Sequence, residues 1–202
     1  YWANALDKRQ ITVDGVVTAI AGGAQGSDLL AYDNKVKFAT SFTGALDVHP
    51  EGAAYNGSEA LAFAKQLTSA VTTDASLAEA MTKLDASTAD FVASSKHPIV
   101  FTLSTTADTG VAFKGGGGDD SFHATAATFS AGDSLHGGGG RNSLFVMDQG
   151  SALATGGPAG VTLTNIQELL LTTNGSVGNS AAYDLSGFAD LREVGVAAAG
   201  AI

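Results

Sequence analysis

The stretch Gly115-Gly116-Gly117-Gly118-Asp119-Asp120-Ser121-Phe122-His123 sets the pattern for the second half of this chain. Four glycines are followed by a polar residue, an aspartate, a serine and a large apolar residue. Glycine adopts positive φ angles at little cost, so such a block predicts a tight turn. The serine and the apolar residue that follow predict a short strand whose apolar side chain points into a core.

Two further stretches repeat this pattern. Residues 128–136 and 137–145 carry a polar residue, a serine and a leucine at matching positions, which places Asp133 nine residues before Asn142. Asp120 precedes Asp133 by thirteen residues, so one strand of the repeat is longer. Short repeats of this kind predict a solenoid in which each turn stacks on the next.

Composition divides the chain near Pro98. Residues 1–97 hold 7 of the 26 glycines, and residues 98–202 hold the other 19. Apolar residues at helical spacing predict an α-helical bundle over 1–97, and the repeats predict a β-solenoid over 98–202. The fold class is therefore α+β in two parts. Because the chain stops within a run that reads as strand, we expect the solenoid to be truncated at its C-terminal end.

The helical part contains two long amphipathic stretches with predicted interior faces, at 28–47 and 75–92. In the first stretch the apolar stripe consists of Leu29, Tyr32, Val36, Ala39, Phe42 and Leu46. In the second stretch it consists of Leu77, Met81, Leu84, Thr88 and Phe91. Shorter helices are predicted at 1–7, 13–21 and 58–67, separated by segments that contain glycine or proline.

Charge and composition narrow the range of functions. The chain carries a formal charge of −10, with 10 basic residues, whereas binding to nucleic acid needs clustered basic side chains that displace counterions. No nucleic-acid partner is therefore expected. The chain has no cysteine, which excludes disulfides, a cysteine-ligated zinc site and a thiol nucleophile. No apolar run approaches the roughly 20 residues of a transmembrane helix.

The glycine turns are candidate calcium sites. Carbonyl oxygens that converge in a turn, and a carboxylate that closes on them, are the hard ligands that Ca²⁺ takes in sets of about six to eight. The predicted metal ligands are Gly116, Gly118, Asp120, Asp133, Gly138, Gly140 and Asn142. Asn142 carries no charge, so its site is expected to be weaker than those of Asp120 and Asp133.

Residues 132–135, Gly-Asp-Ser-Leu, also allow a different interpretation, with Ser134 as a hydrolase nucleophile and His136 nearby. A serine nucleophile needs a base within hydrogen-bond reach and an acid that orients the base. His136 is the last histidine of the chain and no Asp-x-x-His follows it, so we predict no catalytic residues and no enzyme. His123 and His136 share a position in the repeat and are expected on one face of the solenoid.

Residues 115–123 resemble the nonapeptide Gly-Gly-x-Gly-x-Asp-x-apolar-x of RTX (repeats-in-toxin) proteins at every defined position. More broadly, residues 98–202 resemble the repeat region of Caulobacter-type S-layer proteins, through the glycine blocks and the runs 161–171 and 184–191. Residues 1–95 resemble a helical domain that is often found in RTX and S-layer proteins, through the segments Tyr1-Trp2-Ala3-Asn4-Ala5-Leu6-Asp7 and Asn34-Lys35-Val36-Lys37-Phe38-Ala39.

The runs 161–171 and 184–191 also have similar sequences. Ile166 matches Phe188, and Leu169 matches Leu191 at the same spacing. This similarity is consistent with successive turns of a solenoid.

The resemblance implies a right-handed parallel β-roll or β-helix with Ca²⁺ between its turns. It implies type I secretion and an extracellular location on the bacterial cell surface, with self-association into a lattice or filament. The chain would then be part of an S-layer subunit or of an RTX adhesin, and lipopolysaccharide or another surface glycan would be the partner of the helical part. An accessory or glycan-binding module of a secreted RTX enzyme is the alternative.

Overall fold

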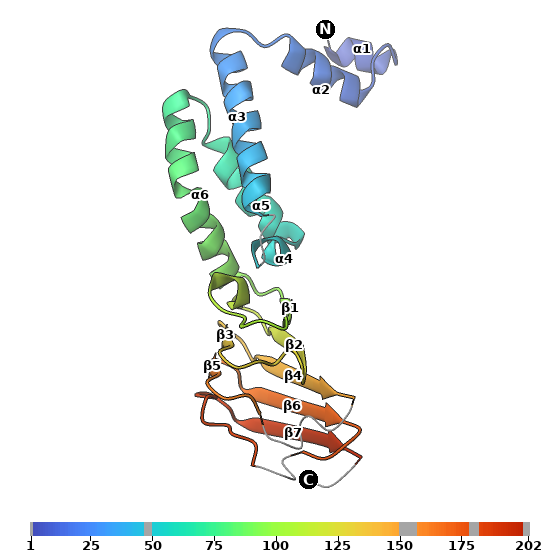
Figure 1. The fold of residues 1–202 in the computed structure, drawn as a ribbon. Coiled ribbons are helices and arrows are strands. Elements are labelled where there is room, and N and C mark those ends of the chain that lie inside the picture. Colours follow the sequence, from blue (N-terminus) through green and yellow to red (C-terminus); the bar gives the residue numbers. More distant parts are fainter. Residues whose placement is uncertain (1, 47–49, 150–156, 178–181, 200–202) are drawn as a thin grey trace. The chain divides into compact units, whose positions relative to one another are not determined.

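A computed structural model describes residues 2–46, 50–149, 157–177 and 182–199 of the chain. Tyr1, which belongs to the helix predicted at 1–7, lies outside this range. So do residues 200–202, which belong to the run in which the chain stops and on which the expected truncation rests. Helices come first along the chain and strands follow (Figure 1). By contacts the chain forms two compact units, one of Tyr1–Ala45 with Leu61–Asp85 and one of Leu46–Ala60 with Ala86–Ile202.

The helices are α1 (Trp2–Asp7), α2 (Val13–Gly22), α3 (Gly26–Ala45), α4 (Glu51–Ala54), α5 (Gly57–Ser69) and α6 (Asp74–Ser94). All five helices expected from the sequence are present, and α4 is a short addition in a segment that was expected to be a connection. Thr12 caps α2, because its side-chain oxygen accepts a hydrogen bond from the backbone N–H of Gly15 at 3.1 Å. No helix in the described ranges has the length and apolar character needed to cross a membrane.

The buried face of α3 differs from the predicted stripe. The buried residues of this helix are Asn34, Phe38 and Phe42. Leu29, Tyr32 and Val36, which were expected inside, are 42%, 47% and 49% exposed. The reason is a polar residue in a core position: the amide of Asn34 donates to the carboxylate of Asp74 at 3.0 Å. Apolar periodicity cannot reveal such a residue. Ala39 is exposed as well, so Phe42 is the one residue of the expected stripe that is buried within α3.

The second unit contains a parallel β-solenoid of about four turns, which confirms this part of the predicted fold. One wall is a five-stranded sheet in the order β1 (Val100–Thr102), β2 (Ser121–Thr125), β4 (Ser143–Asp148), β6 (Glu168–Thr173) and β7 (Glu193–Ala198). The opposite wall consists of β3 (Ser134–His136) and β5 (Thr162–Thr164), which also pair in parallel (Figure 1).

The strand register relates the sequence repeat to the turns. Phe101 pairs with Phe122, which pairs with Leu144, and Leu144 pairs with Leu169. The offsets of thirteen and nine residues seen in the sequence add up to the step between Asp120 and Asn142, which lie 22 residues apart at equivalent positions of β2 and β4. Two repeat units therefore form one turn, with one unit on each wall.

The later turns are longer than the sequence similarity suggested. Leu169 pairs with Val194, and Leu163 forms a bridge with Phe188. The same longer step separates Asn142 from Gln167, which lie 25 residues apart. The expected match of Ile166 with Phe188 and of Leu169 with Leu191 is therefore wrong, because it assumed a shorter turn than the chain forms here.

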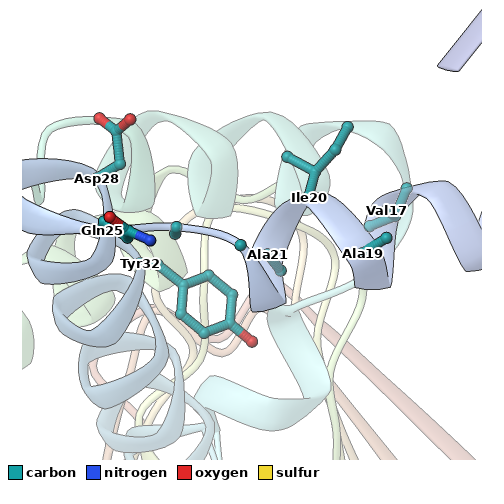
Figure 2. A pocket seen from close by; sticks show the side chains of 9 residues that line it. Val17, Ala19, Ile20, Ala21, Gln25, Asp28 and Tyr32 are labelled. Atoms are coloured by element: carbon teal, nitrogen blue, oxygen red, sulfur yellow. The ribbon is translucent and has the colours of Figure 1, made fainter. Parts of the chain in front are cut away.

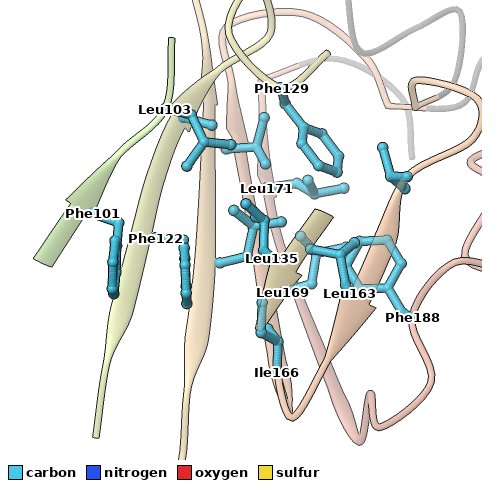
Figure 3. Close-up of a cluster of buried hydrophobic side chains, with 14 of the residues drawn as sticks. Phe101, Leu103, Phe122, Phe129, Leu135, Leu163, Ile166, Leu169, Leu171 and Phe188 are labelled. Carbon is cyan, nitrogen blue, oxygen red and sulfur yellow. The ribbon is translucent and has the colours of Figure 1, made fainter. Parts of the chain in front are cut away.

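The core lies between the two walls (Figure 3). The rings of Phe101 and Phe122 stack face to face, with centroids 4.5 Å apart and an interplanar angle of 6°. Leu135 and Leu163, from the opposite wall, are each 1% exposed and belong to the same buried cluster. Burial of apolar surface stabilises a fold by ~25 cal/mol per Å², so this column of buried side chains stabilises the solenoid.

Candidate functional site

The seven residues predicted as metal ligands lie in the connections between the two walls. Gly116 and Gly118 belong to one glycine turn, and Gly138 and Gly140 belong to the next turn, which packs directly on it. Asp120 and Asn142 end these two turns and precede β2 and β4 at equivalent positions of the register. Asp133 lies apart from these six, immediately before β3 on the other wall.

The glycines allow the turns to approach at backbone contact distance. A Cβ atom at Gly138 would overlap the carbonyl oxygen of Gly116, and one at Gly118 would lie 2.6 Å from the carbonyl oxygen of Lys96. The turns are joined directly, because the N–H of Gly139 donates to Gly116 O at 2.7 Å. At Gly138 the backbone also has a φ of +76°, which favours glycine for a second reason.

The carboxylate of Asp120 is buried, since the residue is 1% exposed, and both of its oxygens accept backbone hydrogen bonds. Oδ1 accepts from the N–H of Ile99, in the preceding turn, and Oδ2 accepts from the N–H of Gly116, both at 2.7 Å. Burial raises the pKa of Asp120 above its ordinary value, although these two hydrogen bonds oppose the shift. Asp120 therefore connects its own turn to the turn before it.

Asn142 is fully buried and has the opposite polarity on its two side-chain atoms. Oδ1 accepts from the N–H of Asp120 at 2.8 Å. Nδ2 donates to the carbonyl oxygens of Gly139 at 2.9 Å and Asn165 at 2.7 Å. An amide is therefore the side chain that this position requires, since a carboxylate would place an acceptor against two acceptors.

Asp133 belongs to a second polar column, together with a residue that the sequence analysis missed. Oδ1 of Asp133 accepts from the N–H of Asp108 at 2.9 Å, and Oδ2 accepts from the N–H of Ser130 at 2.8 Å. Asp108 is 4% exposed and accepts in turn from Ser104, at the backbone N–H and at the hydroxyl, both at 2.8 Å. Asp108 lies 25 residues before Asp133, one turn earlier, and this spacing could have revealed it. It was missed because no glycine block precedes Asp108 in the sequence.

These contacts test whether the residues suit a calcium ion. Calcium needs about six to eight oxygens that converge on one point. Both carboxylate oxygens of Asp120 and of Asp133 face N–H donors, and the amide nitrogen of Asn142 takes two of the nearby carbonyl oxygens. Across the described ranges, no three His, Asp or Glu side chains form a metal-binding group. The arrangement thus does not fit calcium, whose binding stays a prediction from the resemblance.

The residues of the hydrolase interpretation have structural partners. Ser134 begins β3, and its backbone N–H donates to Asp108 O at 2.8 Å. Nδ1 of His136 accepts from the N–H of Gly138 at 3.0 Å.

His123 lies on β2, in the other wall, where its ring stacks on that of Phe145 with the ring centroids 4.9 Å apart. The expectation that His123 and His136 share one face is therefore wrong, because successive repeat units alternate between the walls.

A second candidate region lies in the first unit, between α2 and the start of α3 (Figure 2). Val17, Ile20 and Tyr32 line a cavity of about 900 Å³ together with Asp28. Val17 and Ile20 are 62% and 54% exposed. The lining is mainly apolar, and Asp28 supplies a carboxylate, so the groove suits an apolar surface better than an anionic one.

We compared the chain with protein-family models, with curated proteins and with solved structures, and none of them matches it.

Proposed function

We propose that this chain is a structural part of a secreted bacterial surface protein, either an S-layer subunit or an RTX-type adhesin. The observation that supports this role is the solenoid, in which the strands of one wall pair in parallel, one after another, from β1 to β7. A stack of this kind is an extended scaffold whose surfaces repeat along one direction. Such a scaffold acts by contact with other molecules and needs no catalytic group.

The proposal includes other features that the resemblance implies, apart from the calcium ions. We expect the solenoid to be right-handed, since parallel strands joined by a crossover wind this way in nearly all proteins. We expect the helices of the first part to form a bundle that contacts lipopolysaccharide or another surface glycan. Type I secretion and a location on the cell surface complete the proposal.

Self-association is the part of this function that the outer face of the solenoid supports best. Strands alternate their side chains, so the residues between the core positions point outward. Among them Phe145 and Met147, on β4, are 36% and 51% exposed, and the His123 ring stacks on Phe145. Apolar side chains at the centre of an exposed sheet face favour contact with another copy of the chain.

Electron microscopy and analytical ultracentrifugation of the purified chain test this proposal. We expect ordered lattices or filaments that grow with protein concentration. The double variant Phe145→Thr and Met147→Thr should reduce assembly and lower the melting temperature only slightly, because both side chains are exposed and the lost contact is the stack of Phe145 on His123. Val111→Thr is the matched control, since Val111 is 77% exposed but lies outside the sheet. A chain that stays monomeric at all concentrations and binds a soluble glycan would instead support the enzyme-accessory module.

A further inference from the structure

Three side chains in consecutive turns form a ladder along the solenoid. Ile99, Asp120, Asn142 and Gln167 occupy the same position of the register, each immediately before a strand of the five-stranded sheet. The N–H of each of the first three donates to the side-chain oxygen of the next, at 2.7, 2.8 and 2.8 Å respectively. We call the side chains of Asp120, Asn142 and Gln167 the oxygen ladder.

The oxygen ladder supplies an acceptor where the backbone alone has none. In a parallel sheet the backbone carbonyl of each residue already accepts a hydrogen bond from the neighbouring strand. The N–H of Ser143, for example, donates to Asp120 O at 3.0 Å. The N–H at the ladder position points toward the next turn and lies in the interior, where an unpaired donor is costly. A side-chain oxygen from the following turn satisfies this N–H and fixes the register of the two turns.

Nitrogen donors of the protein itself bind carbonyl oxygens of these turns, in the way that a cation would. The amino group of Lys96 donates to Gly117 O at 3.1 Å, and the amide of Asn142 donates to two carbonyl oxygens of the turns beside it. These nitrogen donors occupy carbonyl oxygens of the kind that a calcium ion would need. The polarity around Asn142 therefore suits a hydrogen-bond donor at the place where a calcium site would have an anion.

We infer that the oxygen ladder registers the turns of this solenoid without a metal ion, and that Asn142 is the specific residue which makes a metal unnecessary. The resemblance to the RTX nonapeptide predicts the reverse, with an aspartate at this position as the stronger calcium ligand. The inference concerns how the turns are held together, so it does not depend on where the protein resides or on whether it assembles.

The variant Asn142→Asp separates the two alternatives. It restores the acidic residue of the nonapeptide and adds an acceptor beside the carbonyl oxygens of Gly139 and Asn165. With a metal-free ladder, the melting temperature should fall by roughly 4–8 °C, equally in EDTA and in calcium, because acceptors face acceptors. A variant that melts above the wild type in calcium would overturn the inference.

A second pair of variants covers the case in which Asn142→Asp does not fold. Gln167 is half-buried, and its Oε1 accepts from the N–H of Asn142. Gln167→Glu keeps an acceptor and should melt within about 2 °C of the wild type, whereas Gln167→Leu removes it and should melt several degrees lower. Equal melting temperatures for these two variants would show that the side-chain oxygen does not hold the turns, and would overturn the inference independently of assembly.

Discussion

The backbone N–H of Asp120 donates to Oδ1 of Asn142, 22 residues later, at 2.8 Å. This contact joins two glycine turns that the sequence analysis had placed around a cation. The carboxylate of Asp120 does the same for the turn before it, by accepting from Ile99. The polar residues that follow the glycine blocks are therefore hydrogen-bond partners of the neighbouring turns, and this role explains their burial.

The close packing of the turns predicts different effects for two glycines with similar φ angles. Gly138 and Gly110 have φ angles of +76° and +78°, but only Gly138 has no space for a Cβ atom. Gly110→Ala should cost about 1–3 kcal/mol of unfolding free energy, since its φ of +78° and ψ of −158° lie in a region that is essentially restricted to glycine. Gly138→Ala should cost about 1–3 kcal/mol more, because its Cβ overlaps Gly116 O. Chemical denaturation measures both, and equal losses would contradict the packed turns.

Asp133 should be among the most sensitive polar residues. Its carboxylate accepts from the N–H groups of Asp108 and Ser130, which lie in the interior or close to it. Asp133→Ala leaves two donors without this partner, at about 1–3 kcal/mol each. Asp119→Ala is the control, since the exposed Asp119 accepts only from the N–H of Arg141 among the described contacts. Denaturation curves in which the control variant loses as much stability would contradict the second polar column.

The buried carboxylate of Asp120 also predicts a pH dependence. Burial raises the pKa of Asp120 in the folded state above the ordinary aspartate value of 3.8. At pH values between 3.8 and the raised pKa, the folded protein therefore binds more protons than the unfolded chain. The contribution of Asp120 to stability should therefore increase as the pH falls through the raised pKa toward 3.8.

The variant Asp120→Asn isolates this contribution, because it cannot titrate. On acidification the melting temperature of the wild type should rise relative to that of the variant. A wild type that loses stability relative to the variant would contradict the raised pKa, and would indicate that the two backbone hydrogen bonds or a nearby cation outweigh burial.

Tyr183 should ionise late and tolerate removal of its hydroxyl. Among the described residues the hydroxyl has no hydrogen-bond partner, and burial raises the pKa of Tyr183 to about 12. Tyr183→Phe should therefore leave the melting temperature unchanged or raise it slightly, since no hydrogen bond is lost. Spectrophotometric titration of the wild type and the variant should differ by one tyrosine that ionises near pH 12. A clear loss of stability in the variant would reveal a partner for the hydroxyl.

The sequence predicted the architecture better than it predicted the chemistry. Strand positions and stacking followed from Phe122 and Leu144, because each lies at a fixed distance after a glycine block and both must be buried. The interior face of α3 was wrong because Asn34 takes a core position through its contact with Asp74. The role of Asp120 was outside the reach of spacing alone, since its partner Ile99 lies in a different turn.

The glycine blocks illustrate the same difference. A run such as Gly137 to Gly140 predicts a turn whether the carbonyl oxygens converge on an ion or the backbones of two turns touch. The two cases differ in the atoms that face the turn, and these atoms come from residues such as Lys96 and Asn165, which lie in other turns of the chain. Asn142 in place of an aspartate was the one sign in the sequence that favoured direct contact.

Thermal unfolding of the wild-type chain, followed by circular dichroism in excess EDTA and in saturating calcium, tests the central claim most directly. A solenoid whose turns are joined by Asp120, Asn142 and Gln167 should melt at the same temperature in both conditions. A melting temperature that is several degrees lower in EDTA, and that is restored by calcium, would contradict the metal-free ladder and support the calcium sites implied by the resemblance.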